Sequence, residues 1–186
     1  DPGLADTINT SRRNPLYLPD IPLNAMIRAT GTLAQAAKAD IVVPVVPAQY
    51  LRGVLAQASS DIRPGAPLVV CAKGIELETG KLMSQVTAET CPAALPAILS
   101  GPNFAHEIAR GLPAAATLAC ADGEKIVAVR DALASRAFRL YLSTDMTGTQ
   151  VGGAVKNVIA IACGIVVGRH MGENARAAVV TRALHE

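Results

Sequence analysis

The stretch that decides the fold is Leu68-Val69-Val70-Cys71-Ala72, an uninterrupted apolar run that lies between a proline–glycine turn and the pair Lys73-Gly74. Runs of β-branched and apolar residues of this length predict a strand that is covered on both faces, as in a parallel sheet. Residues 40–47 form a similar run, although Pro44 is unfavourable in the middle of a strand. Further strands are predicted at residues 96–100, 114–119 and 138–142.

Helical patterns separate these strands, at residues 50–59, 82–90, 104–110 and 125–135. Strands that alternate with helices at this spacing predict βαβ units, so the fold class is α/β with a mostly parallel sheet. Before the first run, the sequence predicts short helices at 4–13 and 32–38 and a short strand at 27–30. From Thr147 onward the pattern is mainly helical, which places a domain boundary near residues 143–150.

Residues 151–161, Val-Gly-Gly-Ala-Val-Lys-Asn-Val-Ile-Ala-Ile, are apolar nearly all round a helix. This pattern predicts a helix buried in protein, and Lys156, Asn157 and the glycines argue against a membrane span. Burying an ammonium group is costly unless it is paired or has a function, and a lysine in such surroundings can exchange protons near neutral pH. A lysine at the helix edge whose ammonium reaches water is the equally weighted alternative.

Three segments are expected at the carboxyl ends of strands, where open α/β sheets bind ligands: residues 47–50, 73–76 and 101–105. Gly101 opens a turn before a helix, whose free N–H groups suit an anion, and Asn103 adds a polar side chain there. Each segment also has a purely structural explanation. Gly-Pro is common before helices, Lys73 could be a surface lysine, and Tyr50 could cover the sheet edge.

The composition excludes several classes of protein. The 186 residues are 51% hydrophobic, which excludes a disordered chain, and their net charge of +2 is too small for a dedicated nucleic-acid or polybasic membrane surface. No His, Cys, Asp or Glu cluster has the spacing of metal ligands, so no metal is expected. Four cysteines without Cys-x-x-Cys pairing, and a start without a secretory signal, predict a cytoplasmic protein.

Seven short blocks follow one another along the chain: NPLYLPDIP (14–22), VVPAQY (45–50), AKGIE (72–76), SGPNFA (100–105), RGLP (110–113), GGAVKNVIAI (152–161) and GENARAAVVT (172–181). Each block is a weak signal alone, but the ordered set is specific. Together they resemble the bacterial NAD(P)-dependent glycerol-3-phosphate dehydrogenases. The resemblance implies a Rossmann-like, NAD- or NADP-binding domain over residues 1–146, and the start of an all-α substrate and dimerisation domain over residues 147–186.

The resemblance also implies an activity. The enzymes of this family interconvert sn-glycerol 3-phosphate and dihydroxyacetone phosphate by hydride transfer, supply phospholipid synthesis, and would be cytoplasmic homodimers. The family's Gly-x-Gly-x-x-Gly loop does not occur in this sequence, and its Ser-Arg-Asn block would lie beyond Glu186. The chain is therefore expected to be an incomplete copy that is inactive on its own.

The resemblance assigns roles to individual positions. Lys156 matches the catalytic lysine, which accepts the proton of the C2 hydroxyl, and Asn157 matches its hydrogen-bonding neighbour. Lys73 matches a lysine that contacts both cofactor and substrate, and its charge would help to keep Lys156 able to exchange a proton. Gly101 and Asn103 match substrate contacts, although the family often has Ser or Thr at position 103. The remaining matches are cofactor contacts, at Pro47, Tyr50 and Ala105.

Two other hypotheses remain open. The chain could belong to the wider 3-hydroxyacid and 6-phosphogluconate dehydrogenase group, which also places a Lys-Asn pair on a buried helix. It could also be a non-catalytic module that uses its sheet for binding or dimerisation. The AKGIE and SGPNFA blocks favour glycerol-3-phosphate dehydrogenase over both.

Overall fold

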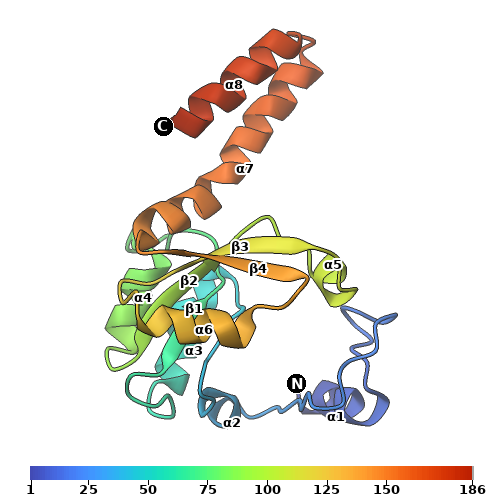
Figure 1. The fold of residues 1–186 in the computed structure, drawn as a ribbon, viewed down its shortest axis with the longest axis vertical. Helices are drawn as coiled ribbons and strands as arrows, with labels where there is room; N and C mark the ends of the chain where they lie inside the picture. Colours follow the sequence, from blue (N-terminus) through green and yellow to red (C-terminus); the bar gives the residue numbers. More distant parts are fainter. Residues whose placement is uncertain (186) are drawn as a thin grey trace.

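A four-stranded sheet forms the centre of the computed structural model, which describes residues 1–185 (Figure 1). Its strands lie in the order of the chain: β1 (Pro67–Val70), β2 (Leu95–Ser100), β3 (Ala114–Ala119) and β4 (Phe138–Ser143). β1 pairs with β2 in parallel, as β3 does with β4, whereas β2 and β3 are antiparallel. The predicted α/β class with a mostly parallel sheet is therefore confirmed, with one reversal that the sequence did not indicate.

Helices precede, connect and follow the strands: α1 (Pro2–Ser11), α2 (Leu33–Ala37), α3 (Ala48–Ala58), α4 (Met83–Thr90), α5 (Ala105–Ala109), α6 (Lys125–Leu133), α7 (Met146–Gly168) and α8 (Glu173–His185). The alternation of β1 divides the core between the two faces of the sheet. Leu68 and Val70 pack with residues of α3 and α4, whereas Val69 packs with residues of β3 and α6. All three are fully buried, and burying each such side chain contributes about 1.5–3 kcal/mol.

Two of the predicted strands are wrong. Residues 40–47 do not form a strand: Val42 makes one isolated parallel bridge to Leu68, and Pro44 and Pro47 have no N–H group to extend a ladder. Residues 27–30 do not form a strand either. Here the side chain of Asn9 replaces a strand partner, since its amide exchanges two 2.8 Å hydrogen bonds with the backbone of Ala29.

The prediction that residues 151–161 form a buried helix is also wrong. They lie in α7 as expected, but of its residues only Gln150, Gly153 and Val166 are buried, and Lys156 and Asn157 are exposed. The reason is packing. Only the first turns of α7 contact β2 and β3, and in the described part of the chain the later turns pack against α8 (Figure 1).

α7 and α8 form an antiparallel pair that extends away from the sheet (Figure 1, orange and red). Along α7 this arrangement leaves large apolar side chains in solvent, such as Val158 at 66% and Ile161 at 64% exposed. Within residues 1–185, α7 is the one helix that is long and apolar enough to cross a membrane. The core helix of a soluble protein passes the same test, so the pattern alone is weak evidence of a span.

Candidate active site

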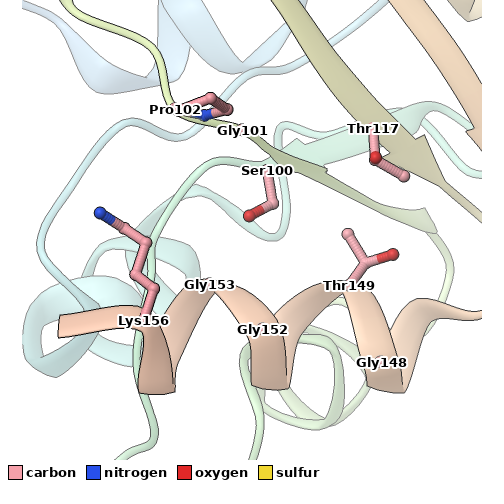
Figure 2. Close-up of a pocket in the computed structure, with 9 residues that line it drawn as sticks. All are labelled: Ser100, Gly101, Pro102, Thr117, Gly148, Thr149, Gly152, Gly153 and Lys156. Atoms are coloured by element: carbon pink, nitrogen blue, oxygen red, sulfur yellow. The ribbon is translucent and has the colours of Figure 1, made fainter. Parts of the chain in front are cut away.

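A cavity of about 290 Å³ lies between the first turns of α7 and the neighbouring ends of β2 and β3 (Figure 2). The Lys156 side chain extends from α7 toward the segment that carries Gly101 and Pro102 (Figure 2). The complete lining is Ser100, Gly101, Pro102, Thr117, Gly148, Thr149, Gly152, Gly153 and Lys156. Lys156 and Gly101, which lie far apart in the sequence, thus share one cavity.

Two side chains near the start of α7 fix its position. Asp145 caps the helix, since its Oδ1 accepts a 2.8 Å hydrogen bond from the N–H of Gly148. Gln150 is buried and joins α7 to the start of α4. Its Oε1 accepts from the N–H of Ser84 at 2.8 Å, and its Nε2 donates to the Ser84 hydroxyl at 2.9 Å. The turn that precedes Lys156 is therefore held against the α/β domain.

Two glycines allow the backbones around the cavity to approach closely. A Cβ atom at Gly153 would lie 2.8 Å from the Ser100 hydroxyl oxygen, closer than real Cβ atoms approach such an atom. A Cβ at Gly101 would lie 2.8 Å from the Ala115 carbonyl oxygen. Position 101 therefore requires glycine for β2 and β3 to meet as they do, whereas a side chain at position 153 would force the Ser100 hydroxyl to rotate or α7 to move.

Lys73 connects the end of β1 to the end of β2. Its Nζ donates a 2.7 Å hydrogen bond to the carbonyl oxygen of Gly101. Its Cγ lies 3.6 Å from the position of a Cβ at Gly153, which precedes Lys156 by about one helical turn. The structure thus brings Lys73, Gly101 and Lys156 into one neighbourhood.

The remaining predicted site residues do not line this cavity. Pro47 is the residue before α3, Tyr50 lies on α3 with 68% of its surface exposed, and Ala105 begins α5. Asn157 follows Lys156 on α7 and is exposed. Asn103 is partly buried, and its Oδ1 atom is buried without a hydrogen-bond partner in residues 1–185.

Sequence reasoning missed three hydroxyl groups that line the cavity, those of Ser100, Thr117 and Thr149 (Figure 2). Ser100 lies in the SGPNFA block and could have been included from its position there. Thr117 lies within β3 and enters the site because it pairs with Ser100 across the antiparallel β2–β3 ladder. No local pattern indicates that pairing.

Burial raises the pKa of the Cys71 thiol, which lies two residues before Lys73, and the charge of Lys73 opposes this only in part. A thiol with a raised pKa is protonated at neutral pH and is a poor nucleophile. The Cys71 thiol is therefore not expected to act as a nucleophile beside Lys73.

Two family models match the chain. Residues 1–126 match the N-terminal model of NAD-dependent glycerol-3-phosphate dehydrogenase, and residues 145–186 match the C-terminal model. The chain belongs to this family. The resemblance of the seven sequence blocks is thereby confirmed.

Similar proteins agree with this family. The chain is 52% identical to the glycerol-3-phosphate dehydrogenase [NAD(P)+] of Parvibaculum lavamentivorans, covering 98% of the chain and 55% of that protein. It is 53% identical to the enzyme of the same name from Bradyrhizobium sp., covering 100% of the chain and 57% of that protein. The chain thus spans about half the length of these curated relatives.

A solved structure extends the agreement to the fold. The crystal structure of glycerol-3-phosphate dehydrogenase from Coxiella burnetii matches with a TM-score of 0.86 at 30% sequence identity, covering 100% of this chain and 57% of that one. The arrangement of sheet and helices described above is therefore the arrangement of this family.

Proposed function

We propose that the protein to which this chain belongs is an NAD- or NADP-dependent glycerol-3-phosphate dehydrogenase, which interconverts sn-glycerol 3-phosphate and dihydroxyacetone phosphate. The observation that carries the proposal is that Gly101 and Lys156 line one cavity and that Lys73 is hydrogen-bonded to Gly101, in a chain of this family. Two lysines beside a cavity suit a substrate that carries a phosphate group and a reacting oxygen.

In the proposed reaction Lys156 exchanges one proton. When dihydroxyacetone phosphate is reduced, the ammonium group of Lys156 donates a proton from Nζ to the C2 oxygen, on which negative charge develops. In the opposite direction the neutral amine accepts the proton of the C2 hydroxyl. The nicotinamide cofactor supplies or accepts the hydride when it is bound, and the protein holds the reacting groups in place. Lys73 stabilises negative charge nearby and fixes the Gly101 turn through its hydrogen bond.

The residues present include a buried acceptor that a bound ligand would satisfy. The buried Oδ1 of Asn103 lacks a partner within residues 1–185, and such an acceptor is suited to an N–H or O–H donor of a ligand. We propose that Pro47, Tyr50, Lys73 and Ala105 hold the cofactor, that Lys73, Gly101, Asn103 and Lys156 bind the substrate, and that Asn157 assists Lys156.

The test is the Lys156→Ala variant of the full-length protein. Removing a general acid–base group lowers turnover by about 10²–10⁴-fold. We expect the reduction of dihydroxyacetone phosphate to fall by this factor, while NAD(P)H binding, followed by its fluorescence, is retained. Lys125→Ala is the matched control, because Lys125 lies on α6 with 64% of its side chain exposed and outside the cavity. Near-normal turnover of Lys156→Ala would contradict the assignment.

We further propose the organisation that the family resemblance implies. Residues 1–146 belong to the NAD(P)-binding domain and residues 147–186 begin the helical substrate domain. The full-length protein is a cytoplasmic homodimer without a membrane span, and it supplies glycerol 3-phosphate for phospholipid synthesis. Light scattering of the purified full-length protein tests the dimer, and its recovery in the soluble fraction without detergent tests the absence of a span.

A further inference from the structure

After Lys73, the segment between β1 and α4 passes over the start of α3. Gly74 has a φ of +143°, and a Cβ there would lie 3.1 Å from the Cβ of Ala48, the first residue of α3. Glycine therefore lets the segment turn toward α3 immediately after Lys73. The next three residues are attached to α3 by side chains.

Gln49 of α3 holds the backbone of this segment on both sides of Glu76. Its Nε2 donates to the carbonyl oxygen of Ile75 at 2.9 Å, and its Oε1 accepts from the N–H of Leu77 at 3.0 Å. The side-chain amide of Gln49 thus donates one hydrogen bond and accepts another, as the backbone of a paired β-strand residue does. The segment therefore cannot slide along α3 without breaking both bonds.

Arg52, about one turn further along α3, binds the side chain of Glu76. Its Nε donates to Oε1 at 2.9 Å and its Nη2 to Oε2 at 2.8 Å, which is the paired geometry that an arginine–carboxylate contact favours. The Glu76 side chain is only 9% exposed. The guanidinium group of Arg52 and the hydroxyl of Thr79 lower the pKa of Glu76 to about 2, so the carboxylate is charged at neutral pH.

A buried carboxylate at this place is costly unless its partner is present, and the chain supplies that partner from a different element. Only two residues, Gly74 and Ile75, separate Glu76 from Lys73. The other end of the Lys73 side chain donates to Gly101. The orientation of Lys73 is thus set on one side by the attachment to α3 and on the other by β2.

We propose that Arg52 and Glu76 are a positioning pair for Lys73. They hold the segment on α3 so that Nζ of Lys73 reaches the carbonyl oxygen of Gly101, a residue that lines the same cavity as Lys156. The proposal rests on the proposed function, because it takes Lys73 as the residue that contacts both substrate and cofactor. Neither member of the pair lines the cavity, and Lys73 is linked to it by the hydrogen bond to Gly101, which does line it. Any effect of the pair on the cavity is therefore indirect.

A purely structural role would give different kinetics. If the pair only stabilised the fold, its loss would reduce the fraction of active molecules, which lowers kcat and leaves KM unchanged. If the pair positions Lys73, its loss weakens binding at a site that is otherwise intact. KM for dihydroxyacetone phosphate and for NAD(P)H then rises more than kcat falls.

The experiment uses the full-length protein with Glu76→Gln, which keeps the size of the side chain and removes its charge, and Arg52→Lys, which keeps the charge and removes the fork. For Glu76→Gln we expect KM for dihydroxyacetone phosphate to rise about tenfold or more while kcat changes by less than about threefold. Arg52→Lys should show a smaller rise of the same kind. The control is Glu89→Gln, which removes the more exposed partner of Arg52, 42% exposed, and should leave KM unchanged.

A double variant tests whether the effect of Glu76→Gln on KM depends on Lys73. In a Lys73→Ala background, Glu76→Gln should produce no further rise in KM, because the group that it positions is already absent. A KM unchanged in Glu76→Gln, or a rise of the same size with and without Lys73, would overturn the proposal.

A crystal structure of the Glu76→Gln protein gives a readout that does not depend on the reaction. Loss of the contact between Nζ of Lys73 and the Gly101 carbonyl supports the positioning role, and retention of that contact overturns it. If the wild-type protein does not reduce dihydroxyacetone phosphate, the proposed function fails, and the crystal structure still decides whether the pair places Lys73. Should Glu76→Gln not fold, the same structure of Arg52→Lys gives the answer.

Discussion

Replacing Gly153 by alanine tests how closely α7 must approach β2. In the middle of a helix, glycine is less favourable than alanine by about 1 kcal/mol, so the substitution gains this much if the methyl group has room. The adjacent Gly152 provides the matched control, because a Cβ there would meet no heavy atom within 4 Å in residues 1–185. Gly152→Ala should therefore stabilise the protein by about 1 kcal/mol.

At Gly153 the added Cβ would lie 2.8 Å from the Ser100 hydroxyl oxygen and 3.6 Å from Cγ of Lys73. The first distance is well below the optimal separation of non-bonded atoms, so the hydroxyl must rotate or α7 must move. Overpacking of this kind costs about 1–3 kcal/mol, which offsets or exceeds the helical gain. Gly153→Ala should thus be less stable than Gly152→Ala by about 1–3 kcal/mol.

Urea unfolding of the full-length wild type and the two variants measures this difference, provided that the m-values agree. A third variant identifies the atom responsible. Ser100→Ala removes the clashing oxygen and leaves the Ser100 Cβ at 3.9 Å, an ordinary contact distance. Gly153→Ala combined with Ser100→Ala should therefore recover most of the lost stability. Equal stabilities of Gly152→Ala and Gly153→Ala, or no recovery in the combined variant, would refute the packing argument.

Three further predictions concern the contacts that hold the site. The folded pKa of Glu76 is about 2 against an ordinary value of 4.5, so its ion pair stabilises the fold fully above pH 4.5 and is lost as the pH falls toward 2. The unfolding free energy of Glu76→Gln, measured from pH 6 to 2, should fall less in this window than that of the wild type, and parallel curves would contradict this. Asp145→Ala removes the cap of α7 and should cost about 1 kcal/mol in urea unfolding, whereas Asp145→Asn keeps an acceptor and should cost little. Gln150→Leu leaves the N–H of Ser84 without its partner and should destabilise the protein by about 1–3 kcal/mol, and a neutral effect in the same assay would show that α7 is held by other contacts.

Strands could be predicted from the sequence where an uninterrupted apolar run is bounded by turn residues. The sequence predicts a strand at residues 114–119, and β3 has the same bounds, because this run of alanine, threonine and leucine is bounded by turns. Residues 40–47 have an equally apolar sequence but make only one bridge, since two prolines remove donors that a ladder needs. The antiparallel pairing of β2 with β3 depends on the path of the chain between them, which no local pattern records.

The candidate site was predictable in part. Lys73, Gly101 and Lys156 were singled out from blocks of sequence; in the structure Gly101 and Lys156 line one cavity, and Lys73 is hydrogen-bonded to Gly101. The apolar pattern of residues 151–161 correctly predicted a helix, but it wrongly predicted that the helix is buried. Such a pattern shows how apolar the surface of a helix is, and it does not show which elements pack against that surface. Thr117 was missed for a similar reason, as it reaches the cavity only through its pairing across the sheet.

The two hydrogen bonds between Gln150 and Ser84 attach α7 to α4 near its first turns. If α7 tilted about Gln150, the displacement of each residue would grow with its distance from Gln150 along the helix axis. Lys156 lies six residues beyond Gln150, about 9 Å along the axis, whereas Gly168 lies about 27 Å beyond it. A tilt of about 10° around Gln150 would carry Gly168 through about 5 Å but Lys156 through only about 1.6 Å. Such a tilt would thus displace the outer end of the α7–α8 pair by several ångströms and the backbone of Lys156 by roughly half the length of a hydrogen bond.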